Sequence, residues 1–492
     1  MTNPLQMVLD VVTLPFEKLR QYQEEDFYKG IACPIFGAFL DLGLGKTILS
    51  ILIAVYKLLT NEFDRAYVLC PASLITQWMG VLESLGLNAV AYRGTPKQRE
   101  KIDLEVDFLV VSFQIFQQDY ERLKRSDAYI IVDEATILCQ VSNILYKMLA
   151  GGEVRKKLPM KEGQLKPEFS IRRLNKIMFG GSMLSATPTN KNEDAYGIIS
   201  LKTPGIYTNY NQFLRIHVDE YDYFNKPKSY KSLDLLRDNL LLNSSHRLVT
   251  DHIDLPPIIF KTVFYDLSSA HQELYDKLLN EKFLELDGKV MIDALQAVSL
   301  FHWSQRIILA PEKGGLKEEA VIFELLSMAI SSMRNFIIFS NYVDSNKSLM
   351  SKFNIGGIFG GATPKQKDQA IKDFTEGKLN GLTIHPKSGG QGLNLQCTHN
   401  VLFPELPVTP RDFRQCCGRV YRSGQDSTVV VTVFVAKDTV QQSIFNRVLK
   451  RDLESSKMMR VDNLLQDSLS SNEFVQGKIS KKELLEVLRG KG

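Results

Sequence analysis

The chain has 492 residues, of which 44% are hydrophobic and 24% charged, and its net charge is +4. This length provides for about two to four domains with ample cores. The net charge is too small for nucleic-acid binding by bulk charge, so such binding would need a local track of contacts. The six cysteines show no C-x₂-C spacing, which favours buried, reduced thiols over disulfides or zinc.

The first candidate site is a loop between a strand and a helix. Ala38–Leu40 is typical of the end of a buried strand, and Ile48–Leu59 is typical of an apolar helix. Gly43 and Gly45 lie between them, where backbone N–H groups can approach phosphate oxygens without a Cβ in the way. The full phosphate-loop pattern has glycine at position 40, where this chain has Leu40. An ordinary loop is the alternative interpretation.

Two further segments supply charges for ATP and Mg²⁺. Lys46 would reach the β- and γ-phosphates, and the Thr47 hydroxyl would bind Mg²⁺. Tyr129–Val132 has the composition of a buried parallel strand, and it places Asp133 and Glu134 at its carboxyl end, where open α/β sheets bind ligands. Asp133 would hold Mg²⁺ through its water shell, and Glu134 would orient or deprotonate the attacking water. A solvated turn is the alternative.

Strands and helices alternate from about residue 23 to 190, which predicts a parallel sheet covered on both faces. The expected strands are Tyr67–Cys70, Phe108–Val111, Tyr129–Val132 and Met183–Ser185. Residues 191–255 favour helical segments without strong strands. In the second half, a helical stretch at 269–308 precedes further expected strands. These are Phe336–Ser340, Gly357–Phe359, Leu382–Ile384, Asn400–Phe403 and Val429–Phe434.

The segment from about residue 149 to 174 is rich in basic residues. Its cations are Arg155, Lys156, Lys157, Lys161, Lys166, Arg172 and Arg173. Glycines and prolines interrupt it, so we expect an exposed loop over much of its length. A solvated insertion is one interpretation, and an auxiliary DNA contact is the other.

Two arginines three residues apart could supply positive charge to a bound nucleotide. Arg419 and Arg422 stand at i and i+3, which predicts that they lie on one helix face, where they could stabilise charge on the transferring phosphoryl group. The flanking Gln415 is a candidate member of the same catalytic group, although its role and that of Gln425 fit holding the geometry better than chemistry. A surface helix paired with acids is the alternative.

An ordered series of segments resembles the motifs of superfamily II helicases and, within them, the Swi/Snf-type DNA translocases. The series runs through Leu19–Gln23, Gly43–Thr47, Val68–Trp78, Leu109–Phe113, Asp133–Thr136, Leu184–Asn190, Leu255–Pro257, Asp266–Ser268, Leu274–Tyr275, Ser388–Leu395 and Gln415–Gln425. It covers the chain from about residue 19 to 441. Three departures mark a divergent member: Thr136 stands where many relatives have His, Ser185–Thr187 has the general helicase form, and Pro404–Pro410 lacks Trp–Asn–Pro.

The resemblance implies an α/β fold of two RecA-like parallel-sheet lobes with helical protrusions and an ATP cleft between the lobes. We expect residues 1–255 to form the first lobe, with a helical protrusion at 191–255. Residues 256–460 should form the second lobe, with a helical insertion at 269–308. Residues 461–492 should form a tail. The implied adenine contact is Gln23, and the coupling motif is Ser185, Ala186 and Thr187. Candidate nucleic-acid contacts are Ser73, Trp78, Ser112, Thr363, Gly390 and Asn394. Core packing is the alternative for Trp78, and an ordinary turn is the alternative around Thr363.

These implications together describe an ATP- and Mg²⁺-dependent translocase or helicase on duplex or single-stranded DNA, largely independent of sequence. Two alternatives stay open: an RNA-dependent ATPase of the same superfamily, and a clamp that binds nucleic acid but barely hydrolyses ATP. Met1–Arg20 has no basic start typical of a signal peptide. The longest apolar run, near Ile48–Tyr56, is too short for a membrane span. We therefore expect a soluble, intracellular protein with no membrane partner.

Overall fold

The computed structural model describes residues 3–157, 169–223, 225–286, 289–293, 296–386 and 395–459. The described residues divide into two compact units, one up to His252 together with Lys457–Met459, and the other Ile253–Ser456. The division after His252 lies three residues before the expected one. Among the described residues, none of the helices combines the length and apolar character needed to cross a bilayer. Each unit is built around one parallel sheet.

The first unit has a seven-stranded sheet in the order β11-β1-β8-β5-β2-β4-β3. Its strands are β1 (Ile35–Leu40), β2 (Arg65–Cys70), β3 (Ala89–Tyr92), β4 (Phe108–Ser112), β5 (Ala128–Asp133), β8 (Gly180–Leu184) and β11 (Ser244–Arg247). All pairings are parallel. Every residue of β1, β2 and β4 is buried, as continuous apolar runs require in a sheet covered on both faces.

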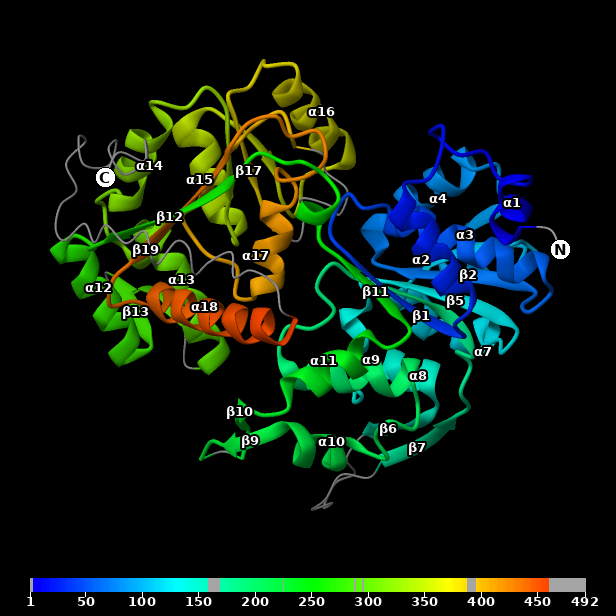
Figure 1. Ribbon diagram of the computed structural model, residues 1–492. Helices are drawn as coiled ribbons and strands as arrows, with labels where there is room; N and C mark the ends of the chain where they lie inside the picture. The colour runs from blue at the N-terminus through cyan, green and yellow to red at the C-terminus, as the bar shows by residue number, and fades with distance from the viewer. Residues whose placement is uncertain are drawn as a thin grey trace. The chain divides into compact units, whose positions relative to one another are not determined.

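Helices cover both faces of this sheet (Figure 1). One group packs around α3 and contains α1 (Pro4–Leu9), α2 (Gln21–Ile31), α3 (Lys46–Leu59) and α4 (Ile75–Ser84). The other contains α6 (Phe113–Gln118), α8 (Ile144–Ala150), α9 (Ala195–Lys202) and α11 (Leu233–Leu241). Shorter or outlying helices are α5 (Pro96–Arg99), α7 (Tyr120–Leu123) and α10 (Tyr210–His217). The predicted strand–helix alternation is confirmed.

Three features of the first unit differ from the sequence prediction. β11 is a seventh strand within 191–255, and it pairs with β1 although its Ser–Ser–His–Arg sequence has no apolar pattern. The same region contains an antiparallel hairpin of β9 (Val218–Tyr221) and β10 (Pro227–Tyr230). The predicted basic loop is partly regular, because β6 (Gly152–Lys157) and β7 (Phe169–Leu174) form another hairpin. Residues 158–168 between them, with Lys161 and Lys166, lie outside the described part of the chain.

The second unit repeats the topology of the first. Its six-stranded sheet has the order β12-β19-β18-β15-β17-β16, again with parallel pairings. The strands are β12 (Ile258–Tyr265), β15 (Phe336–Phe339), β16 (Gly356–Ile358), β17 (Gly381–Ile384), β18 (Asn400–Phe403) and β19 (Val429–Ala436). Without β11, the first sheet has the same order when its strands are ranked along the chain. The predicted fold class, two parallel-sheet lobes with helices, is confirmed.

Alternate residues of these strands enter two separate cores. Ile338 and Leu402 belong to one core, whereas their neighbours Ile337 and Val401 belong to the other. Such a split is the signature of a sheet with helices on both faces. The helices are α12 (Ser269–Glu281), α13 (Ala297–Leu309), α14 (Val321–Ile330), α15 (Val343–Phe353), α16 (Pro364–Thr375), α17 (Pro410–Cys417) and α18 (Val440–Met459).

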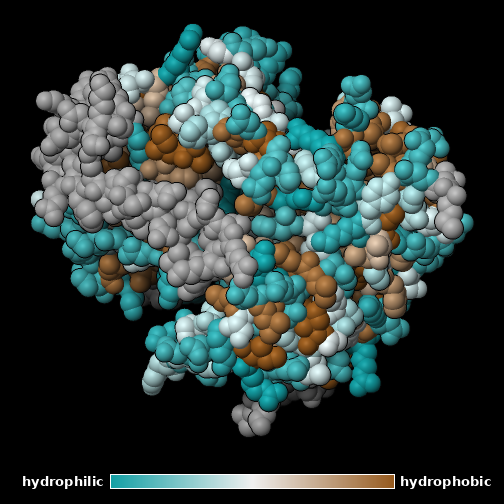
Figure 2. Space-filling model, viewed as in Figure 1, coloured by the Kyte–Doolittle hydropathy of each residue, from teal (hydrophilic) through white to brown (hydrophobic). Residues whose placement is uncertain are grey.

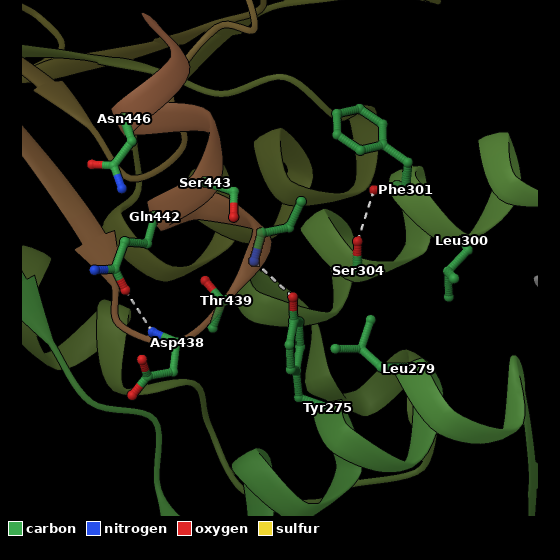
Figure 3. Close-up of a pocket in the computed structure, with 11 residues that line it drawn as sticks. Tyr275, Leu279, Leu300, Phe301, Ser304, Asp438, Thr439, Gln442, Ser443 and Asn446 are labelled. Carbon is green, nitrogen blue, oxygen red and sulfur yellow. Dashed lines mark hydrogen bonds between the residues drawn. The ribbon is translucent and has the colours of Figure 1, made fainter. Parts of the chain in front are cut away.

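Sequence reasoning missed β12, and it read 269–308 as one helical stretch. That stretch contains α12 and α13 separated by a hairpin of β13 (Phe283–Leu286) and β14 (Lys289–Asp293). Between α12, α13 and the start of α18 lies a cavity of about 580 Å³ (Figure 3). At its wall the buried Tyr275 hydroxyl accepts a hydrogen bond from the Val440 N–H at 2.8 Å. None of the predicted site residues lines this cavity, and Tyr275 serves to fix the start of α18.

Part of the surface of the first unit is apolar. Figure 2 shows hydrophobic side chains gathered over α9 and α11. Two leucines of this region, Leu235 and Leu242, are 48% and 50% exposed. Single exposed leucines are ordinary in folded proteins, but a contiguous group is less common. The first unit therefore keeps nonpolar surface outside its core.

Candidate nucleotide site

The loop after β1 has the backbone shape expected of a phosphate loop. Gly43 and Gly45 adopt φ values of 85° and 84°, a region that side chains with a Cβ rarely occupy. Leu40, which replaces the expected glycine, is the fully buried last residue of β1. Its carbonyl accepts a hydrogen bond from Lys46 Nζ at 2.6 Å, and the Asp41 carbonyl accepts another at 3.0 Å. Position 40 thus belongs to the strand, and the turn needs glycine only at 43 and 45.

Gln23 lies against this loop, 20 residues upstream of it in sequence. Its Nε2 donates to the Leu44 carbonyl at 3.2 Å, and the Tyr22 hydroxyl donates to the same carbonyl at 3.2 Å. A Cβ on Gly45 would approach Gln23 Nε2 to 2.3 Å, so that the Gln23 side chain would have to shift. The structure therefore brings the implied adenine-contacting residue and the phosphate loop together. Tyr22 was not singled out from the sequence, although it stands beside Gln23 in the motif.

The loop is also held by β11, the strand that sequence reasoning missed. The Asp41 N–H donates to the Arg247 carbonyl at 3.0 Å, and Asp41 Oδ2 accepts from the Val249 N–H at 3.0 Å. Arg247 in turn donates to the buried Asp26 of α2 at 2.8 Å. These contacts join the start of the loop to the last strand of the unit. No local sequence pattern around Asp41 indicates a partner more than 200 residues away.

Asp133 ends β5, next to a buried tryptophan. Trp78 is 2% exposed, and its Nε1 donates to Asp133 Oδ2 at 2.9 Å. The other carboxylate oxygen accepts from the Glu134 N–H at 2.9 Å. Trp78 therefore does not face solvent as a nucleic-acid contact, and the core-packing alternative holds with a polar function added. It orients the carboxylate proposed to hold the metal.

The charge state of Asp133 depends on its neighbours. Desolvation raises the pKa of its carboxyl to about 6, and the Glu134 carboxylate adds to this rise. The hydrogen bond from Trp78 and the positive charge of Lys46 act in the opposite direction. Glu134 itself has a φ of 57°, a left-handed conformation that is strained for a residue with a side chain. Such strain is common where a fold aims a catalytic side chain.

These residues fit a magnesium ion. The donor set of carboxylate and hydroxyl oxygens from Asp133 and Thr47 is of the hard type that Mg²⁺ prefers, and Mg²⁺ commonly uses only one or two protein ligands together with water and phosphate. Desolvation is the main cause of the raised pKa of Asp133, and the adjacent Glu134 carboxylate adds to it. No group of three or more metal-ligating side chains occurs among the described residues.

The predicted coupling motif follows β8 directly. The Ser185 hydroxyl donates to the Thr187 carbonyl at 2.8 Å and accepts from the Thr187 N–H at 3.2 Å, so the two residues form a tight turn that also spans Ala186. Cys139, beyond η2 (Ala135–Leu138), donates through Sγ to the Pro188 carbonyl at 3.3 Å. The segment after Asp133–Glu134 therefore contacts the coupling motif through Cys139. The same segment has Thr136 at the position where many relatives have histidine.

The two arginines do not share a regular helix, so that part of the prediction is wrong. α17 ends at Cys417 with Gly418 as its cap, and Arg419 and Arg422 lie in the turns that follow. Arg419 is 7% exposed, and desolvation lowers the pKa of Arg422. Gln415 lies within α17.

The glutamine that follows the arginines has the geometric role expected of it. Gln425 is buried, and its Nε2 donates to the carbonyls of Thr398 at 2.9 Å and Val420 at 3.2 Å. Its Oε1 accepts from the Asp426 and Ser427 N–H groups at 3.1 Å each. One side chain thus ties the arginine turns to the segment before β18.

The candidate nucleic-acid contacts fall into three groups. Ser73 is exposed after β2. Ser112 is 2% exposed and its hydroxyl accepts from the Ile115 N–H at 3.3 Å, capping α6, so its side chain is not available to nucleic acid. Thr363 is exposed but caps α16 in a reciprocal pair with Gln366, as an ordinary helix start would. Gly390 and Asn394 lie outside the described residues.

Two domain families match the chain. The SNF2-related domain matches residues 38–158 and 179–306, and the helicase conserved C-terminal domain matches residues 317–424. Together they cover the phosphate loop, the Asp133–Glu134 pair and both arginines. The unmatched residues 159–178 contain β7, whereas β6 lies within the matched segment.

Relatives with curated names agree with these matches. An uncharacterized ATP-dependent helicase of Mycoplasma pneumoniae is 24% identical over 93% of this chain and 44% of its own length. A mouse protein named chromodomain-helicase-DNA-binding protein 1-like is 22% identical over 84% of this chain and 46% of its own length. The chain thus spans less than half the length of these relatives. A solved SWI2/SNF2 ATPase core of Sulfolobus solfataricus in complex with dsDNA is 21% identical over 96% of this chain and 98% of that chain, with a TM-score of 0.40.

Proposed function

The chain belongs to the SNF2-related family of ATP-dependent helicases, and on this basis we propose that it couples ATP hydrolysis to movement along DNA. The observation that carries the proposal is the convergence of four sequence-distant segments in the first unit. Hydrogen bonds join Gln23 to the 43–47 loop and Trp78 to Asp133, and the positive charge of Lys46 in the loop acts on the Asp133 carboxylate. Such an arrangement fits binding of a nucleoside triphosphate at the carboxyl ends of parallel strands.

Each residue has a distinct task in this proposal. Gln23 contacts the base, the N–H groups of the loop cradle the phosphates, and Lys46 exchanges the Leu40 and Asp41 carbonyls for phosphate oxygens. Thr47 and Asp133 hold the metal, which when bound neutralises charge on the phosphates. Glu134 orients the attacking water and accepts its proton.

The second unit contributes the arginines. We propose that Arg419 and Arg422 place positive charge on the transferring phosphoryl group, as arginines do in related mechanisms. Gln415 and Gln425 hold the turns that carry them. Because an arginine from a second lobe acts only when the lobes close on the nucleotide, hydrolysis and release would alternate the grip of the lobes on the strand. Ser73 and Thr363, both exposed, are proposed contacts to the DNA backbone, as are Gly390 and Asn394.

The test is ATP hydrolysis measured in parallel without nucleic acid and with duplex DNA, single-stranded DNA and RNA at equal salt. We expect at least one DNA form to stimulate hydrolysis tenfold or more. The degree of stimulation should not depend on the sequence of that DNA. Lys46→Ala is the control for contaminating ATPases. Stimulation by RNA alone would identify an RNA-dependent ATPase, and binding of DNA without turnover would identify a clamp.

A second measurement separates translocation from unwinding. Displacement of a third strand from a DNA triplex reports movement along duplex DNA, whereas release of a labelled strand from a forked duplex reports separation. We propose translocation as the shared activity, so triplex displacement should occur with ATP and stop in Glu134→Gln. An ATPase that is stimulated by DNA but active in neither assay would contradict movement.

A further inference from the structure

A second polar concavity lies in the first unit, away from the nucleotide loop. It has a volume of about 410 Å³ and is lined by α7, the turn before β5 and the segment from β7 to β8. Five cationic side chains line it, with one carboxylate, Glu121. The cations are Lys124, Arg125, Arg172, Arg173 and Lys176. We call this surface the basic groove. Its lining has an excess of four positive charges, as large as the net charge of +4 of the whole chain.

Most ion pairs in the basic groove are exposed and therefore weak. Arg173 is 87% exposed at its side chain and reaches Glu153 at 3.2 Å, and Arg172 and Lys124 share the single carboxylate of Glu121. Exposed pairs contribute about 0–1 kcal/mol, so a phosphate can replace the carboxylate at little cost. Arg125 is different, because its two bonds to Asp127 at 2.7 and 2.8 Å form a close bidentate pair.

Aromatic rings lie among these cations. Lys176 Nζ lies 5.1 Å from the centre of the Phe179 ring, and the Arg172 guanidinium carbon lies 5.6 Å from that of Tyr120. Phe179 is 50% exposed, so its ring is accessible beside these cations. Cations interleaved with an exposed ring are the composition of surfaces that bind a phosphate backbone and stack on bases.

The basic groove lies at the opposite edge of the sheet from the nucleotide. Lys124–Asp127 precede β5 and Lys176–Phe179 precede β8, whereas Asp133 and Ser185 follow the same two strands. Because β5 and β8 are parallel, their beginnings share one edge and their ends the other. A strand of five or six residues is about 17–20 Å long, so direct contact between the two sites is excluded.

We propose that the basic groove is a second nucleic-acid-binding surface, which takes the phosphate backbone of DNA on Arg172, Arg173 and Lys176 and a base or sugar on Phe179. The proposal does not rest on ATP hydrolysis. An acidic protein segment is the other polyanion that could bind cations, but it offers no planar base to the exposed ring.

The test removes three charges from the basic groove: Arg172→Gln, Arg173→Gln and Lys176→Gln in one chain. The matched control removes three exposed charges at the other hairpin of the unit: Lys226→Gln, Lys228→Gln and Lys231→Gln. Binding of a labelled 30-base-pair duplex is followed by anisotropy between about 50 and 300 mM salt. Each lost phosphate contact reduces the slope of log K against log salt by about 0.9.

We expect the groove variant to bind duplex DNA at least tenfold more weakly at low salt, with a slope smaller by about two to three. The control variant should match wild type in both, and DNA-free ATP hydrolysis and the melting temperature should be unchanged in all three chains. Phe179→Ala should weaken the binding of single-stranded DNA about fivefold or more, because stacking of a base contributes about 1–3 kcal/mol. Equal affinities and slopes in the groove and control variants would overturn the proposal. Equal competition by poly-glutamate would overturn it in favour of an acidic protein partner.

Discussion

The two units share one sheet topology but use its strand ends differently. In both, an acidic residue lies at or just after the end of the fifth strand of the main sheet, counted along the chain. β5 ends at Asp133, which Glu134 follows, and β18 ends at Phe403, which Pro404 and Glu405 follow. Asp133 and Glu134 are both partly exposed beside the phosphate loop. Glu405 is 2% exposed and accepts from the Asn341 N–H at 3.1 Å and the Ser340 hydroxyl at 3.3 Å.

Burial raises the pKa of Glu405 to about 7, although those hydrogen bonds and the charge of Arg306 oppose the rise. Glu405 thus holds the segment that leads into α15, whereas Asp133 and Glu134 are partly exposed at the carboxyl end of β5. Under the proposed function, the same position on the same topology would serve structure in the second unit and chemistry in the first. The sheet topology positions the acidic residue, and the loop that follows the strand determines what the residue contacts.

The largest effect should come from the arginines of the second unit. Arg422→Ala and Arg419→Ala should each lower kcat by about 10³-fold or more, because positive charge on the phosphoryl group is lost. Nucleotide affinity should change less than fivefold. Arg447→Ala, an exposed cation on α18, is the control and should behave as wild type. Normal DNA-stimulated turnover in both Arg419→Ala and Arg422→Ala would show that the second unit supplies no catalytic charge.

The contrast between the two acids can be measured directly. Glu134→Gln should lower kcat by about 10²–10⁴-fold while ATP still binds, because Asp133 and Lys46 are intact. Glu405→Gln should keep kcat within about threefold, since that carboxylate faces backbone and hydroxyl donors. Single-turnover hydrolysis and binding of a fluorescent ATP analogue distinguish the two. If both substitutions reduce turnover equally, the acids are not divided between chemistry and structure.

A smaller effect should follow from Trp78→Phe, which keeps the buried ring and removes the Nε1 donor to Asp133. Loss of a hydrogen bond to a charged group costs about 1.5–3 kcal/mol, so the magnesium concentration for half-maximal ATPase should rise about tenfold. At saturating magnesium kcat should recover. A fall in kcat that magnesium does not restore would mean that Trp78 acts on packing alone.

The smallest effect is on stability. The pKa of Asp133 is about 6 in the folded chain and about 3.8 when unfolded, so the unfolded state binds fewer protons between these values and wild-type stability falls as pH rises through this window. Asp133→Asn lacks this penalty. Its free energy of unfolding relative to wild type should therefore grow by about 1–2 kcal/mol from pH 4 to 7. This is less than the full pKa difference would give, because solvent screens the partly exposed carboxyl. Melting curves in EDTA without nucleotide measure this, and a constant difference across pH would contradict it.

The sequence allowed prediction of the elements whose residues are buried on both faces. Tyr129–Val132 and Val429–Phe434 are continuous apolar runs, and the structure has strands there. β11 could not be found this way, because it is an edge strand of polar residues without an apolar pattern. β12 could have been found from its aromatic and β-branched residues, but it was overlooked between the Pro256–Pro257 pair and α12.

The site was predictable where the chemistry needs particular residue types. Gly43, Gly45 and Lys46 follow from the demands of a phosphate, and the structure gives both glycines the required φ. The contacts of Trp78 with Asp133 and of Asp41 with Val249 depend on tertiary folding, which brings together residues 55 and 208 positions apart. The shared helix face of Arg419 and Arg422 failed because Gly418 ends α17 first.

The contact between Asp41 and Val249 also sets an order of events during synthesis. The phosphate loop leaves the ribosome early, but its first residue is fixed by β11 and the Val249 N–H, which are made about 200 residues later. Pairing of β1 with β11 closes a long stretch of chain, a slow step in folding. A nascent chain that ends before residue 244 would therefore carry the whole loop sequence without its final support. The phosphate loop therefore reaches its final conformation only after β11 has paired with β1.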